Sequence, residues 1–110
     1  MKIIILRHAE RYESPQYFTP LTINGLIQAD KMITELPADI DCIYCSPFLR
    51  TIQTIFPYCK QHNKKIKIEN SFYERCHGPE FNHHNYRHNI KELDQSWGYL
   101  SSIIDDNYKS

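Results

Sequence analysis

The stretch Ile3-Ile4-Ile5-Leu6, followed at once by Arg7-His8-Ala9-Glu10-Arg11, decides how the chain is interpreted. A short run of β-favouring apolar residues that ends in charge predicts a central parallel strand with polar groups at its carboxyl end. Ligands of open α/β sheets bind at that edge. Arg7 offers a planar fork for a phosphate or carboxylate, and His8 an imidazole that can be a neutral nucleophile. The alternative, that Arg7 and His8 only begin a solvated loop, remains open at this point.

Beyond this stretch, helix and strand patterns alternate along the chain. Thr22 is a typical helix N-cap, apolar residues recur after it at helical spacing, and Pro37 ends the pattern. Pro57 is expected to kink or divide the second helix. Polar segments follow each predicted strand, which argues for a parallel sheet with those segments along one edge. The predicted elements are helix 22–36, strand 40–45, a helix after residue 47, strand 66–69 and an amphipathic helix over 91–105.

This topology predicts that Arg7, His8, Arg50 and Glu74 converge on one pocket. Two arginines can neutralise a phosphoryl group, an imidazole can attack it, and a carboxylic acid can protonate the leaving oxygen. No glycine-rich phosphate loop is present in the sequence, which disfavours a P-loop nucleotide site.

The length, charge and cysteine content of the chain limit the classes of protein to which it can belong. The chain of 110 residues is long enough for one small domain, and its 13 basic and 13 acidic residues cancel, so no general basic field for nucleic acid is implied. No apolar run is long enough for a membrane span, and residues 1–6 do not make a signal peptide. Without a secretion signal, the cysteines favour a reduced cytoplasmic protein over a disulfide scaffold. These are Cys42, Cys45, Cys59 and Cys76.

Metal sites are disfavoured, and no cofactor is expected. Cys42 and Cys45 have the C-x-x-C spacing, but in a strand residues three apart point to opposite faces. His84 and His88 have zinc-like helical spacing, yet no third ligand of clear spacing accompanies them. A solvated loop over the active-site edge is the favoured interpretation of that region.

Four motifs in order resemble those of a known family. They are Leu6-Arg7-His8-Ala9-Glu10-Arg11, Pro20-Leu21-Thr22-x-x-Gly25-x-x-Gln28-Ala29, Cys45-Ser46-Pro47-x-x-Arg50-Thr51-x-Gln53-Thr54 and Tyr73-Glu74-Arg75-x-x-Gly78. Together they cover residues 3–78 and resemble the histidine phosphatases, also called the phosphoglycerate mutase-like superfamily.

The resemblance implies a three-layer α/β/α fold with a mostly parallel sheet, and one domain over residues 1–110 in which 79–110 form a variable loop and helix. It implies a phosphatase that hydrolyses phosphomonoesters, either phosphorylated small molecules or phosphoproteins, with no metal. The implied roles are His8 as the nucleophile that forms phosphohistidine, Glu74 as the proton donor, Arg7 and Arg50 as phosphate ligands, and Arg11 and Arg75 as additional cations.

The resemblance is incomplete at the end of the chain. Family members place a second histidine after a late hydrophobic strand, whereas Ser102-Ile103-Ile104 leads into Asp105-Asp106-Asn107. The expectation is therefore a truncated gene product, an incomplete reading frame or a degenerate relative that lacks this motif, with weak turnover and self-association through exposed sheet edges. The alternative is a non-catalytic phosphate-binding or regulatory module that kept the arginine pocket.

Overall fold

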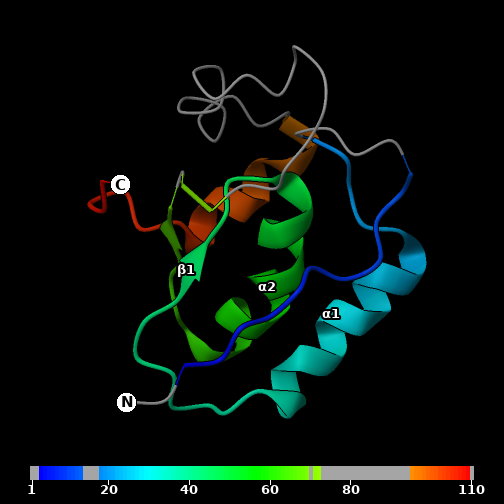
Figure 1. The fold of residues 1–110 in the computed structure, drawn as a ribbon. Helices are drawn as coiled ribbons and strands as arrows, with labels where there is room; N and C mark the ends of the chain where they lie inside the picture. Colours follow the sequence, from blue (N-terminus) through cyan, green and yellow to red (C-terminus); the bar gives the residue numbers. More distant parts are fainter. Residues whose placement is uncertain (1–2, 14–17, 70, 73–94, 110) are drawn as a thin grey trace.

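The structure is a computed structural model that describes residues 3–13, 18–69, 71–72 and 95–109. Helix α2 lies at its centre. Helix α1 contacts α2 along one side, and the short sheet and the 3-10 helix η4 lie on its other side (Figure 1). The elements in chain order are α1 (Ile23–Glu35), β1 (Tyr44–Cys45), α2 (Leu49–His62), β2 (Lys67–Ile68) and η4 (Gln95–Ile103).

Helix α1 begins where the sequence predicts. The Thr22 side chain accepts a hydrogen bond from the Gly25 backbone N–H at 3.0 Å, which satisfies one of the amide groups left over at a helix N-terminus. At the other end, the Leu36 N–H donates to the Met32 carbonyl, and Pro37 follows. The N-cap prediction is therefore confirmed, and the helix ends before the proline as expected.

Helix α2 runs through Pro57 without a break, so the predicted division of this helix is wrong. Side chains on both sides of the proline are buried, among them Ile52 and Tyr58, and this packing holds the two halves in one helix. The helix ends at Asn63, whose φ of 53° is the left-handed conformation common at helix C-termini.

The sheet is parallel, in agreement with the α/β prediction, but shorter than expected. β1 pairs with β2 in the register Tyr44 to Lys67 and Cys45 to Ile68. On the other side of β2, Ile66 forms a parallel bridge with Ile104. Among the described residues, β1 has no ladder partner on its second edge.

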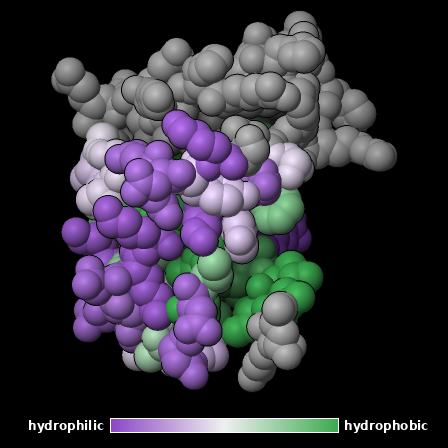
Figure 2. All heavy atoms as spheres, turned by 90° about the vertical axis from the view of Figure 1, so that its left-hand side faces the viewer, coloured by the Kyte–Doolittle hydropathy of each residue, from purple (hydrophilic) through white to green (hydrophobic). Residues whose placement is uncertain are grey.

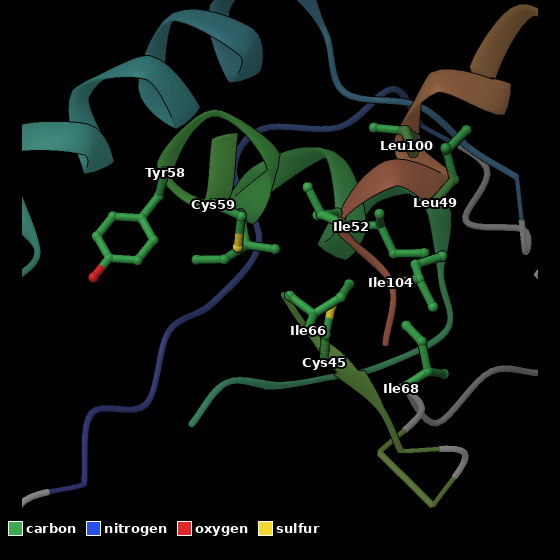
Figure 3. Packing of buried hydrophobic residues seen from close by; sticks show 11 residues of the cluster. Cys45, Leu49, Ile52, Tyr58, Cys59, Ile66, Ile68, Leu100 and Ile104 are labelled. Carbon is green, nitrogen blue, oxygen red and sulfur yellow. The ribbon is translucent and has the colours of Figure 1, made fainter. Parts of the chain in front are cut away.

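The hydrophobic core lies between α2, the sheet and η4 (Figure 3). Leu49 and Ile52 from α2 meet Ile66 beside β2 and Leu100 from η4, and all four side chains are fully buried. Burial of apolar surface on this scale is the main force that holds a small domain together.

The segment Ile3–Leu6 is not a strand, so the prediction of a central strand here is wrong. Ile3 is 76% exposed and Ile5 is 89% exposed, and Figure 2 shows hydrophobic surface uncovered on the face that carries the N-terminal segment. A strand forms only beside a partner, and no described segment forms a ladder with these residues. The three-layer arrangement therefore remains a prediction.

Near the end of the described chain, the type of helix differs from the sequence prediction. The predicted amphipathic α-helix over 91–105 is a 3-10 helix over Gln95–Ile103, and residues 91–94 lie outside the described part. Leu100 and Ile104, two of the apolar residues at helical spacing on which that prediction rests, are nonetheless buried. Within the described ranges, no helix has the length and apolar character needed to cross a membrane.

Candidate active site

An open pocket of about 380 Å³ follows directly after the Ile3–Leu6 segment. Arg7, which is exposed, and His8, which is half-buried, lie in it together with Arg11, as the sequence predicts for the first two. The full lining is Arg7, His8, Ala9, Glu10, Arg11 and Gln28.

The imidazole of His8 is oriented by its own neighbour. Nδ1 lies 2.8 Å from the carbonyl oxygen of Ala9. A carbonyl oxygen only accepts hydrogen bonds, so Nδ1 carries the proton in this contact. In the neutral ring the lone pair is then on Nε2, which makes Nε2 the nucleophilic atom.

Side chains from both helices form hydrogen bonds with the backbone of two neighbouring residues of the pocket lining, Ala9 and Glu10. The Ala9 N–H donates to Thr54 Oγ1 of α2 at 3.0 Å. The Glu10 N–H donates to Gln28 Oε1 of α1 at 2.8 Å. The segment after His8 therefore takes its position from the two helices and from an antiparallel bridge between Arg11 and Leu21.

The start of α1 is fastened to the same segment. The Thr22 N–H donates to the Glu10 carbonyl at 2.9 Å, and Thr22 Oγ1 donates to Glu10 Oε2 at 2.7 Å. Gly25 permits this approach, because a Cβ at that position would lie 2.0 Å from the Glu10 carbonyl oxygen. No side chain fits there without displacement of the backbone.

Arg50 is fully buried and does not line the open pocket. Its guanidinium lies 4.4 Å from the centre of the Phe48 ring, which is a cation–π distance. Thr54 Oγ1 donates to the Arg50 carbonyl at 2.7 Å while it accepts from Ala9. Two hydrogen bonds thus link the backbone of Arg50 to the residue after His8.

The pocket lining carries two arginines, Arg7 and Arg11, and one carboxylate, that of Glu10. The Glu10 carboxylate lies against Thr22 at the N-terminus of α1, a favourable place for negative charge. Neither Arg7 nor Arg11 forms an ion pair within the described ranges. Arg11 Nη1 donates to the Tyr12 carbonyl at 2.9 Å, while Arg11 Nε is buried and has no acceptor among the described atoms.

Cys42 and Cys45, which have the C-x-x-C spacing, lie in different surroundings. Burial raises the pKa of Cys45 to about 12, so its thiol stays protonated at neutral pH. Cys42 is exposed and accepts from Lys67 Nζ at 3.3 Å. Among the residues that the structure describes, no group of three or more His, Cys, Asp or Glu side chains is arranged to bind a metal ion.

Several predicted residues fall outside the described ranges. Glu74 and Arg75, assigned as proton donor and additional cation, lie there, as do His84 and His88. Their predicted roles therefore stay predictions.

Sequence reasoning also missed functional contacts. Hydrogen bonds with Thr22, Gln28 and Thr54 hold Glu10 and Ala9 in place. All three residues appear in the motif matches, but their residue types did not indicate a role at the pocket. Their positions in the same motifs as Gly25 and Arg50 were the sequence feature that could have indicated a role at the pocket.

Comparison with known proteins supplies the last observation. A search of curated proteins found no match. A family model described as the histidine phosphatase superfamily (branch 1) matches residues 3–102 of the 110-residue chain. The match covers the pocket, both helices and the sheet, and the chain belongs to the histidine phosphatase superfamily.

Proposed function

We propose that this protein hydrolyses phosphomonoesters through a phosphohistidine at His8. Membership of the superfamily suggests chemistry of the phosphatase or mutase type. The observation that carries the hydrolytic proposal is the contact from His8 Nδ1 to the Ala9 carbonyl, which leaves the lone pair of the neutral ring on Nε2. Arg7 lines the same pocket beside it.

The proposed reaction has two displacements at phosphorus. His8 Nε2 attacks the phosphoryl group, the P–N bond forms and the ester P–O bond breaks. The leaving oxygen takes up a proton, for which the family resemblance implies Glu74. Water then attacks the phosphohistidine and gives a proton to the carboxylate that protonated the leaving oxygen; the new P–O bond forms, the P–N bond breaks, and phosphate leaves. Arg7 stabilises the negative charge on the phosphoryl oxygens in both displacements.

Arg50 is proposed as the second phosphate ligand. Its support is indirect: the Arg50 carbonyl and the Ala9 N–H share Thr54 Oγ1, so the two segments are positioned together. A guanidinium held in a buried place against Phe48 loses little freedom when it binds a phosphate oxygen.

Phosphorylation of His8 is the direct test. The protein is exposed briefly to a small phosphomonoester such as 4-nitrophenyl phosphate, quenched at alkaline pH and digested, and the phosphorylated histidine is located by mass spectrometry. We expect acid-labile phosphate on His8, and none in His8→Gln. His62→Gln is the matched control, because His62 lies on α2 outside the pocket lining and contacts the Ile33 carbonyl. Hydrolysis that proceeds with no phosphate on His8 would exclude this mechanism.

One observation favours a second function, a module that binds phosphate without turnover. Catalysis needs groups held within fractions of an ångström, whereas Ile3–Leu6, which leads into Arg7 and His8, is exposed and forms no ladder within the described residues. Calorimetric titration with inorganic phosphate distinguishes the two functions. Saturable binding with neither turnover nor phosphohistidine supports the module, and turnover with phosphorylation supports the phosphatase.

A further inference from the structure

Arg11 is a second cation in the pocket whose role the phosphoryl group does not account for. It follows His8 by three positions and lines the same pocket as Arg7. A chain covers at most about 3.3–3.6 Å per residue, so the Cα atom of Arg11 lies within about 11 Å of that of His8 and within about 14 Å of that of Arg7. The side chains of Arg7 and Arg11 can therefore contact two separate groups of one small ligand.

The surroundings of Arg11 leave part of its hydrogen-bonding capacity unused. Its Nη1 donates to the Tyr12 carbonyl, but its Nε is buried without an acceptor among the described atoms. Buried donors in proteins are nearly always paired, and an unpaired one calls for an explanation such as an absent ligand. Glu10, the acidic residue of the lining, directs its carboxylate to Thr22 instead.

From these contacts we infer that Arg11 binds a second anionic group of the substrate. The inference rests on the proposed function and specifies its substrate class: small phosphomonoesters that carry a carboxylate or a second phosphate. Arg7 and His8 receive the phosphoryl group that is transferred, and Arg11 receives the other anion. The pocket volume of about 380 Å³ suits a small molecule rather than a protein surface.

Binding of phosphonates tests this without turnover, because their P–C bond is not hydrolysed. Benzylphosphonate carries the phosphoryl-like group alone. Its 4-carboxylate and its 4-phosphonomethyl derivative add the two candidate anions, and its 4-carboxamide matches the carboxylate in size without the charge. Calorimetric titration gives the four dissociation constants. We expect one or both of the doubly anionic ligands to bind roughly ten- to a hundredfold tighter than the carboxamide, the range for hydrogen bonds to charged groups.

Variants then assign the preference to Arg11. In Arg11→Gln the ratio of carboxylate to carboxamide affinity should fall close to one, and Arg11→Lys should keep part of it. Arg7→Gln should weaken all four ligands and keep the ratio. Lys60→Gln, which removes an exposed cation outside the pocket lining, is the control for net charge. Circular dichroism establishes that each variant is folded.

The outcomes separate this inference from the proposed function. If the wild-type protein binds both doubly anionic ligands no more tightly than the carboxamide, the role of Arg11 is overturned, even where His8 is phosphorylated normally. A preference that persists in Arg11→Gln assigns the second anion to another residue and overturns it too. Failure of all four phosphonates to bind, together with no phosphate on His8, overturns both proposals.

Discussion

Gly25→Ala should damage the pocket although Gly25 is not part of its lining. The added Cβ would lie 2.0 Å from the Glu10 carbonyl oxygen and 3.1 Å from Leu21 Cβ, and contacts below 3.0 Å essentially do not occur, so Glu10 must move by about 1 Å. That carbonyl is the acceptor of the Thr22 N–H and belongs to the segment that carries Arg11.

The expected cost follows from three effects. Overpacking of this kind costs about 1–3 kcal/mol, and loss of the hydrogen bond from Thr22 to Glu10 costs about 0.5–1.5 kcal/mol more. Alanine recovers at most about 1 kcal/mol through its higher helix propensity. The free energy of unfolding should therefore fall by about 0.5–4.5 kcal/mol, and the thermal midpoint by about 4–8 °C for each of these kcal/mol.

Urea denaturation and calorimetric titration with inorganic phosphate measure the two effects. Gly98→Ala is the matched control, because a Cβ on Gly98 meets nothing within 4 Å. We expect Gly98→Ala to leave stability and phosphate affinity within about 0.5 kcal/mol of wild type. If Gly25→Ala is as stable as Gly98→Ala and binds phosphate normally, the close approach of α1 to Glu10 does not position the pocket.

Four further predictions follow from the contacts around the site. Thr54→Val removes the acceptor for the Ala9 N–H, so the free energy of unfolding should fall by about 1–3 kcal/mol in urea denaturation, and the affinity for phosphate should fall in calorimetric titration. An unchanged affinity would mean that this hydrogen bond does not position the pocket. Arg50→Lys keeps the charge without the fork, so phosphate affinity in the folded variant should fall by about 1–3 kcal/mol, and unchanged binding would place Arg50 outside the site. Burial raises the pKa of Cys45 and of Cys59 from 9.0 to about 12, so the thiols of the unfolded chain lose their protons at lower pH than those of the folded protein. The free energy of unfolding should therefore decline as pH rises above 9, by at most about 1.4 kcal/mol per pH unit for each thiol. Urea denaturation across this range measures the slope, and a flat profile contradicts the prediction. We further propose that the exposed apolar segment Ile3–Leu6 causes self-association; Ile5→Lys should then lower the mass seen in sedimentation at high concentration, whereas a wild-type chain that stays monomeric refutes it.

Local signals predicted both ends of α1 correctly, because the causes of helix ends are local. Thr22 caps α1 through a residue three positions later, and Pro37 follows the helix end directly. The strand predicted at Ile3–Leu6 failed for the opposite reason: an apolar run needs a partner strand from elsewhere in the chain, and no local pattern supplies one.

The same distinction applies to the site. That Arg7 and His8 share a pocket follows from their adjacency after an apolar run. That Thr54 holds Ala9 does not follow from such a pattern, since the two residues are 45 positions apart. Arg50 was predicted to converge on the pocket. Its backbone is linked to that segment through Thr54, and its guanidinium lies against Phe48, outside the pocket lining.

The uncovered Ile3–Leu6 segment also bears on the lifetime of the protein in a cell. Exposed apolar stretches are what chaperones and proteases act on, and marginal stability is converted into low abundance by that route. A ligand that binds only the folded pocket adds RT ln(1 + [L]/Kd) to stability, about 2.7 kcal/mol at a concentration 100 times Kd. Because the pocket begins at the end of this segment, the supply of phosphorylated ligand would set how much of the protein escapes degradation.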